Sequence, residues 1–337
     1  MDGLRVDAVH ALVDGSATHI LEQVAREVED LEAILQRHLV VVAESDLNDP
    51  RVVRSRDAGG YGCHAQWSDD FHHALHTVLT GERSGYYGDF GTLSQLGDAL
   101  RHGFVYRGQY SQHRRRVHGR PATGVPGWRF VVAAQTHDQV GNRARGERLA
   151  HLTSPGRLKI AAALLLCGPF VPLLFQGEEW GASTPFLFFT GHEDPELARA
   201  VRDGRRRELA ALGWDPETVP DPQARGTFER SLRWSERSHG ACRDLLDWYR
   251  RLIALRRDTP ALRRGRQDDL HAVCDERAGT LIVRRNEIAV ACNLSGTTAT
   301  IDVQGIRGLL LKSTDEIRRE GDALSLPQDS VAVLSLA

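Results

Sequence analysis

The chain has 337 residues, of which 41% are hydrophobic and 26% charged, and its formal net charge at pH 7 is −2. This composition is that of an ordinary soluble globular protein and excludes the disordered and membrane-spanning classes. Because there is no excess of basic residues, neither nucleic acid nor an anionic membrane is expected as a partner.

The cysteines and the N-terminus predict a cytoplasmic protein that uses no cofactor and no metal. The number of cysteines is odd, their spacing is wide and no Cys-x-x-Cys pair occurs, so neither a disulfide framework nor a zinc site is predicted. They are Cys63, Cys167, Cys242, Cys274 and Cys292. Met1 is followed by Asp2 and Gly3, without the apolar run of a secretory signal.

Apolar runs that alternate with helical patterns predict βα units from residue 4 to residue 176. The predicted strands are residues 4–8, 38–43, 65–67, 129–134 and 171–176. The predicted helices are residues 18–37, capped by Ser16, a helix from about residue 70, and residues 93–102 and 158–166. Several of the strands are nearly continuous apolar runs, which suit strands buried on both faces of a parallel sheet or barrel.

The character of the chain changes near its C-terminal end. After a helix predicted over residues 244–257, short segments rich in β-branched residues cover residues 271–273, 280–284, 288–293 and 298–303. Glycines separate them, as in an antiparallel sheet. We therefore predict two domains, with residues 1–262 forming the α/β part and residues 263–337 a small all-β domain.

Candidate catalytic residues follow the first two predicted strands. Arg5 and Asp7 are two residues apart, so they share one face of a strand, and the guanidinium favours an ionised, nucleophilic carboxylate. A simple buried ion pair explains this spacing equally well. Glu44 follows an apolar strand, and an apolar wall raises a carboxyl pKa, as a general acid requires. Its alternative role is that of an ordinary polar residue at a strand end.

Two further polar groups follow the next predicted strands. Residues 135–143 contain His137 and Asp138 and are dense in side chains that hydrogen-bond, which suits a sugar, although a capped loop would look similar. In residues 69–76, His72 and His76 have the i, i+4 spacing of metal ligands, but the His-Glu-x-x-His pattern is missing. Hydroxyl binding is therefore favoured over metal binding in this second group.

These segments together resemble glycoside hydrolase family 13, the α-amylase superfamily. Residues 2–10 resemble its nucleophile motif, residues 41–45 its acid/base motif and residues 136–139 the motif of its third carboxylate. The resemblance implies a retaining double displacement with Asp7 as nucleophile, Glu44 as general acid/base and Asp138 as the residue that stabilises the distorted sugar. The two catalytic carboxyl groups of a retaining enzyme lie about 5–5.5 Å apart.

Three longer stretches, residues 65–73, 137–143 and 175–186, are similar to members of this superfamily that act on maltooligosyltrehalose. This similarity implies cleavage of the α-1,4 bond next to the terminal trehalose unit, with release of trehalose. It also implies that a maltooligosyltrehalose synthase supplies the substrate. The residues implied in substrate binding are Arg5, His10, Asp69, Asp70, Phe71, His72, His73, His137, Gln139 and Asn142.

The resemblance also implies an architecture. The predicted strands correspond to the fourth through eighth strands of a (β/α)8 TIM barrel, followed by a small antiparallel β domain, so we expect an N-terminally truncated chain. Two alternatives remain open. One is another enzyme of the superfamily, such as a 1,4-α-glucan branching enzyme, and the other is an inactive truncated fragment.

Overall fold

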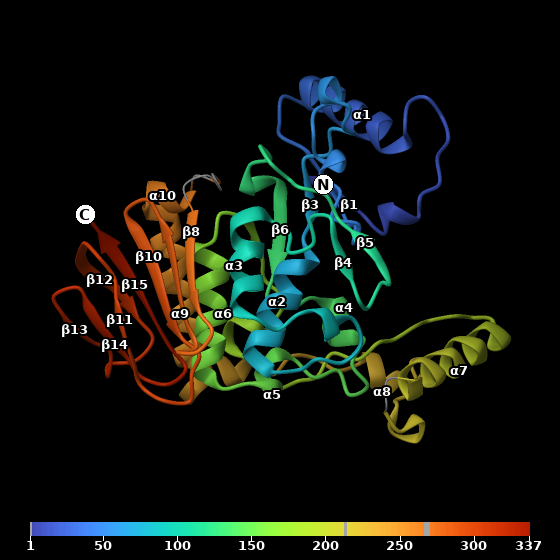
Figure 1. Cartoon of the computed structure of the whole chain (residues 1–337). Coiled ribbons are helices and arrows are strands. Elements are labelled where there is room, and N and C mark those ends of the chain that lie inside the picture. Colours follow the sequence, from blue (N-terminus) through green and yellow to red (C-terminus); the bar gives the residue numbers. More distant parts are fainter. Residues whose placement is uncertain (1, 212–213, 264, 266–269) are drawn as a thin grey trace.

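The computed structural model describes residues 2–211, 214–263, 265 and 270–337. A parallel sheet lies in the middle of the molecule, and helices separate it from two antiparallel sheets built by the C-terminal residues (Figure 1). Among the residues that the structure describes, no helix combines the length and the apolar composition needed to cross a membrane.

The parallel sheet confirms the predicted α/β class. Its strands lie side by side in chain order, as successive βα units produce, and all of its pairings are parallel. The strands are β1 (Gly3–Val6), β2 (Val40–Ala43), β3 (Ala65–Trp67), β6 (Phe130–Ala133) and β7 (Val171–Leu173). All five predicted strands are present, although β1, β2, β6 and β7 are shorter than predicted.

The two outer strands of the sheet, β1 and β7, are partly exposed. Leu4 of β1 is 48% exposed and Val171 of β7 is 41% exposed, so neither strand is buried on both faces. Each of these outer strands has a hydrogen-bonded neighbour on one side only.

All the helices predicted along the chain are present. They are α1 (Ile20–Leu35), α2 (Asp69–Thr80), α3 (Leu93–His102), α6 (Pro155–Cys167) and α9 (Gly240–Asp258). The predicted cap Ser16 is wrong: His19 precedes α1, and its Nδ1 accepts a hydrogen bond from the amide of Leu21 at 3.2 Å. The other α-helices are α4 (His137–Gly141), α5 (Leu149–Leu152), α7 (Pro195–Ala211), α8 (Arg225–Phe228) and α10 (Pro260–Arg263).

Short 3-10 helices and one hairpin complete the α/β part. The 3-10 helices are η1 (Val9–Ala11), η2 (Pro50–Val52), η3 (Arg56–Ala58), η4 (Gly85–Asp89), η5 (Gly127–Arg129), η6 (Glu178–Trp180), η7 (Pro216–Thr218) and η8 (Trp234–Ser238). The hairpin pairs β4 (Gln109–Ser111) with β5 (Arg116–His118) and was not predicted.

The C-terminal residues form two antiparallel sheets, with strand orders β12-β15-β10-β9-β8 and β11-β14-β13. The strands are β8 (Leu270–Asp275), β9 (Thr280–Arg285), β10 (Ile288–Asn293), β11 (Ala299–Asp302), β12 (Ile306–Lys312), β13 (Arg318–Glu320), β14 (Ala323–Leu326) and β15 (Ser330–Leu336). The four predicted strands correspond to β8 through β11.

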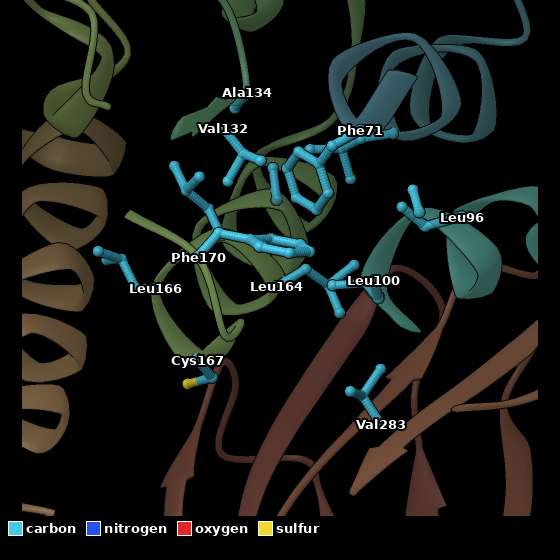
Figure 2. Packing of buried hydrophobic residues seen from close by; sticks show 14 of the residues in the cluster. Phe71, Leu96, Leu100, Val132, Ala134, Leu164, Leu166, Cys167, Phe170 and Val283 are labelled. Atoms are coloured by element: carbon cyan, nitrogen blue, oxygen red, sulfur yellow. The ribbon is translucent and has the colours of Figure 1, made fainter. Parts of the chain in front are cut away.

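One hydrophobic core joins the larger antiparallel sheet to the helices. Buried side chains from α2, α3, β6, α6 and β9 pack in a single cluster, which includes Phe71, Leu100, Leu164, Phe170 and Val283 (Figure 2). Because this core is continuous from the α/β part into the antiparallel sheet, the division of the chain at residue 262 stays a prediction.

Candidate active site

The pairing of β1 with β2 brings the first two candidate carboxylates together. Val6 lies opposite Ala43 in the parallel register, so Asp7 and Glu44 leave their strands at the same edge of the sheet. The backbone continues this pairing, because the amide of Glu44 donates to the carbonyl oxygen of Val6 at 2.9 Å. This carboxyl edge is where active sites of parallel α/β proteins are built.

Arg5 bridges the two carboxylates. Its Nη1 lies 2.7 Å from Oδ1 of Asp7, and its Nη2 lies 2.9 Å from Oε2 of Glu44. The guanidinium carbon stands 4.4 Å from the ring centroid of Trp67, at the end of β3. The arginine is therefore held by a ring on one side and by two carboxylates on the other.

The surroundings push the pKa values of the two carboxyls in opposite directions. The Asp7 side chain is 74% exposed, and a hydrogen bond with Glu44 followed by the charge of Arg5 lowers the pKa of Asp7. Glu44 is only 15% exposed, and burial raises the pKa of Glu44 above its usual value. Both carboxylates lie within 3 Å of the same guanidinium, so the two groups proposed for a retaining pair face one site.

The backbone of Ala8 contributes a donor that the sequence did not reveal. Ala8 has φ 44° and ψ 46°, in the left-handed region that residues other than glycine rarely adopt. In this conformation its amide donates to Oε2 of Glu44 at 2.9 Å. Such strained residues concentrate at functional sites, where the surrounding structure holds them in place.

The third candidate carboxylate lies at the end of β6. Thr136 caps the short helix α4, and its Oγ1 accepts a hydrogen bond from the amide of Asp138 at 3.2 Å. His137 and Asp138 are about half exposed, with 3.7 Å between His137 Nε2 and Asp138 Oδ1. The His137 ring meets the Trp67 ring edge-on, with 6.5 Å between centroids. The structure thus brings this segment to the edge where Arg5 lies.

Asp69 carries a carboxyl group whose ionisation is affected by these neighbouring residues. It follows β3, which pairs with β2 on one side and β6 on the other. Burial, together with the negative charges of Glu44, Asp70 and Asp138, raises the pKa of Asp69 to about 7. Asp69 therefore changes its charge near neutral pH.

Asp70 and Phe71 are placed differently from the expectation of a direct sugar contact. Oδ2 of Asp70 accepts three hydrogen bonds at 2.8 Å, from Nδ2 of Asn48 and from the amides of Val105 and Tyr106. Phe71 is fully buried in the core. Both side chains hold loops and core together, because the first turn of α2 faces inward.

His72 and His73, which the resemblance implies in substrate binding, are buried as well. Nδ1 of His72 lies 2.8 Å from the carbonyl oxygen of Ala134, and Nε2 lies 2.8 Å from the hydroxyl of Tyr87. The His73 ring stands 5.0 Å from that of Tyr86. Burial lowers the pKa of both histidines, so both are neutral at pH 7.

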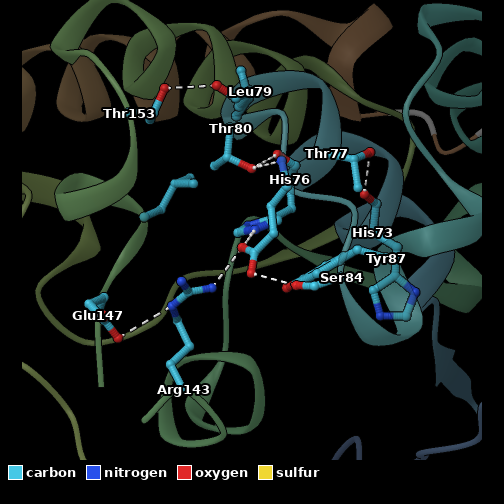
Figure 3. Close-up of polar contacts among 12 residues, drawn as sticks. His73, His76, Thr77, Leu79, Thr80, Ser84, Tyr87, Arg143, Glu147 and Thr153 are labelled. Carbon is cyan, nitrogen blue, oxygen red and sulfur yellow. Dashed lines mark hydrogen bonds and ion pairs between the residues drawn. The ribbon is translucent and has the colours of Figure 1, made fainter. Parts of the chain in front are cut away.

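The i, i+4 pair His72 and His76 is engaged in protein contacts. Nε2 of His76 lies 2.8 Å from Oε2 of Glu82, and the neighbouring hydrogen bonds close a network at the end of α2 (Figure 3). Within the part of the chain that the structure describes, no group of three or more His, Cys, Asp or Glu side chains is placed to hold a metal ion.

The remaining predicted binding residues have partners at the edge of the site. Nδ1 of His10 lies 3.8 Å from Oδ1 of Asp46, and Oε1 of Gln139 accepts from Oγ1 of Thr136 at 2.6 Å. Oδ1 of Asn142 accepts from Nη1 of Arg205 at 3.0 Å. Arg205 was not predicted as a site residue, because it lies 63 residues further along the chain and only the tertiary structure brings it to Asn142.

Comparisons with known proteins were made by sequence and by structure. No family model matches the chain. The chain is 48% identical to the malto-oligosyltrehalose trehalohydrolase of Rhizobium sp. (strain M-11) over 99% of its own length and 56% of that protein. It is 47% identical to the enzyme of the same name from Arthrobacter ramosus, over 99% of its length and 57% of that protein. The chain thus spans a little more than half the length of these curated relatives.

The structural comparison points in the same direction. A crystal structure of a protein assigned as an alpha amylase from Salmonella typhimurium superposes with a TM-score of 0.87 and 37% identity, over 100% of this chain and 57% of that one. The alpha-amylase of H. orenii superposes with a TM-score of 0.60 and 17% identity, over 100% of this chain and 61% of that one. The second similarity concerns the fold alone.

Proposed function

We propose that this chain, which is homologous to the malto-oligosyltrehalose trehalohydrolases along 99% of its length, carries the residues that release trehalose from maltooligosyltrehalose. The bond cleaved is the α-1,4 bond next to the terminal trehalose unit. The observation that carries this proposal is the pair Asp7 and Glu44, joined by Arg5, with pKa values displaced in opposite directions.

The proposed first step is a displacement by Asp7. The lowered pKa keeps Asp7 ionised, so its carboxylate attacks the anomeric carbon while Glu44 gives its proton to the glycosidic oxygen. The carbon–oxygen bond breaks, trehalose leaves, and the oligosaccharide becomes an ester of Asp7. The sugar ring has to enter between the two carboxyls, because the two groups act on opposite sides of the bond that is cleaved.

In the second step Glu44 acts as a base. Its carboxylate takes a proton from water, the water oxygen attacks the anomeric carbon, and the ester bond to Asp7 breaks. Two inversions leave the released oligosaccharide with the α configuration. Arg5 is proposed to orient both carboxylates, and the Ala8 amide to hold Glu44 in place during both transfers.

The proposed substrate contacts are the side chains at the carboxyl edge of the sheet. They are Asp138 for the distorted sugar, with His10, Asp69, His137, Gln139 and Asn142 for its hydroxyl groups. Asp70, Phe71, His72 and His73 are assigned instead to the support of this surface, since their side chains are buried. A maltooligosyltrehalose synthase is the proposed source of the substrate.

The proposed architecture extends the observed sheet. The chain order of β1, β2, β3, β6 and β7 is that of successive strands in a (β/α)8 barrel, and their carboxyl ends carry the proposed catalytic groups. Residues 263–337 are proposed as a separate β domain that packs against α3 and α6.

The test is product analysis with two substrates. The chain is incubated with maltooligosyltrehalose and, separately, with amylose, with an Asp7→Asn variant as the inactive control. Trehalose from the first substrate, absent with the variant, supports the proposal. New α-1,6 bonds in the second would favour the branching enzyme instead, and no product from either would reject catalysis by this chain.

A further inference from the structure

The helix that carries Asp138 is too short to hold its own position. α4 has five residues, and isolated helices of fewer than about 12 residues are marginal in water. Thr136 fixes its N-terminal end. Its C-terminal end, at Gly141 and Asn142, is held by two arginines that reach it from different parts of the chain.

The first arginine is Arg143, directly after this end of α4. Its Nη1 lies 2.7 Å from Oε2 of Glu82, and the same oxygen lies 2.8 Å from Nε2 of His76 on α2 (Figure 3). The hydrogen bond from His76, followed by that from Arg143, lowers the pKa of Glu82 to about 2. Glu82 is therefore ionised at neutral pH and anchors Arg143 to the end of α2.

The second arginine is Arg205, on α7. Its Nη2 donates to the carbonyl oxygen of Gly141 at 2.7 Å, and its Nη1 donates to Oδ1 of Asn142 at 3.0 Å. The side chain is only 8% exposed, and its guanidinium carbon stands 5.0 Å from the ring centroid of Phe188. The planar fork of an arginine suits two such acceptors, whereas a lysine presents a single point charge.

We propose that Arg143 and Arg205 are positioning residues that clamp α4 and thereby set where Asp138 stands relative to Asp7 and Glu44. This proposal rests on the proposed function, in which Asp138 meets the distorted sugar. The two arginines tie one end of α4 to α2 and to α7. The segment after β7, which carries α7 away from the body of the molecule (Figure 1), thus controls a catalytic group that lies far from it in sequence.

The experiment compares Glu82→Gln and Arg205→Met with matched controls. Glu22→Gln is the control for Glu82, because Glu22 is similarly exposed and pairs with Arg26 on α1. Arg207→Met is the control for Arg205, because Arg207 is exposed on the same helix. We expect amide hydrogen exchange over residues 137–147 to rise in the two clamp variants and to stay unchanged in the controls.

Turnover measurements distinguish a role in positioning Asp138 from a role in stabilising the fold alone. A misplacement of about 1 Å costs up to about 100-fold in rate, so kcat should fall 10- to 100-fold in the clamp variants, with KM within about twofold of the wild type. Arg205→Lys keeps the charge without the fork and should fall between the wild type and Arg205→Met. Arg205→Lys also replaces Arg205→Met in the experiment if Arg205→Met does not fold.

The outcomes separate this proposal from the proposed function. Unchanged exchange over residues 137–147 in both clamp variants would overturn the clamp, and faster exchange with unchanged kcat would overturn its effect on Asp138. If the wild type itself releases no trehalose, the proposed function fails. In that case crystal structures of the wild type and Arg205→Lys decide the clamp, since a shift of the Asp138 carboxyl supports it and an unchanged position contradicts it.

Discussion

A single guanidinium, that of Arg5, stands between two carboxylates with different surroundings. Asp7 is largely exposed and Glu44 largely buried, although they follow neighbouring strands in the same register. The arginine favours the ionised form of both, and burial opposes ionisation of Glu44. The pKa of Glu44 is therefore raised by its burial, whereas the pKa of the exposed Asp7 is lowered by its hydrogen bond with Glu44 and by the charge of Arg5, and these opposite shifts suit an acid and a nucleophile.

Arg5→Gln tests this electrostatic arrangement. Removal of a positive charge raises the pKa of both carboxyls, because the charge of Arg5 lowers each of them in the wild type. The acid limb of the pH profile of kcat/KM requires ionised Asp7 and the basic limb requires protonated Glu44, so both limbs should move to higher pH. Arg26→Gln, on the surface of α1, should leave the profile in place. An acid limb that moves to lower pH would contradict the assignment.

Asp7→Asn separates chemistry from binding. The amide cannot form the ester intermediate, so kcat should fall by at least about 10³-fold. Binding of maltooligosyltrehalose, measured by calorimetry, should change little, because hydroxyl contacts supply most of it. Asp2→Asn, at an exposed carboxylate paired with Arg37, is the control and should keep full turnover. Near-normal turnover by Asp7→Asn would remove Asp7 from its proposed role.

The site residues that could be predicted from the sequence are those whose role follows from their place relative to a neighbouring strand. The spacing of Arg5 and Asp7, and the place of Glu44 after an apolar run, put them at a strand end. Asp70 and His72 are also residue types that are common in binding sites, but both side chains are buried and hydrogen-bonded to other residues of the protein. Those partners lie 22 and 62 residues away in the chain, so no local pattern reveals them.

Secondary-structure elements were predictable where one face of a helix or a whole strand is apolar. α3 and β10 have the predicted bounds, whereas the β4–β5 hairpin and α7 were missed. Both missed elements are rich in arginine and contain few large apolar side chains, the residues on which prediction relies. α7 is held instead by particular contacts such as those of Arg205, which depend on the tertiary structure.

Glu82→Gln also predicts a pH-dependent loss of stability. The pKa of Glu82 is lowered to about 2, so its ionised form stabilises the fold above its ordinary pKa, and this contribution disappears as the pH falls towards 2. At pH 7 the free energy of unfolding should drop by roughly 2–3 kcal/mol.

Urea unfolding at pH 7 and at about pH 3 measures this effect. The difference between the wild type and Glu82→Gln should shrink at the lower pH, while Glu22→Gln should cost less than about 1 kcal/mol at both. A difference that stays the same at the two pH values would show that Glu82 stabilises the end of α2 by some means other than its charge.

For the molecule as a whole, the close contact between α3 and the larger antiparallel sheet is the structural feature to test. A Cβ atom at Gly97 would lie 2.8 Å from Sγ of Cys274 on β8. Gly97→Val should therefore destabilise the protein by about 1–3 kcal/mol despite the better helix propensity of valine. Gly296→Val, where a Cβ atom meets nothing within 4 Å, is the control. A melting temperature unchanged by Gly97→Val would contradict the packing of the sheet on α3.

Chemical trapping of the nucleophile tests the central claim most directly. The chain is incubated with 5-fluoro-α-D-glucosyl fluoride, whose fluoride leaves readily while the ring fluorine slows hydrolysis of the ester. The account predicts that peptide mass spectrometry finds one fluoroglucosyl group, attached to Asp7, and none in the Asp7→Asn variant. A label on another carboxylate, or rapid release of fluoride without any label, would contradict the assignment of Asp7 as the nucleophile.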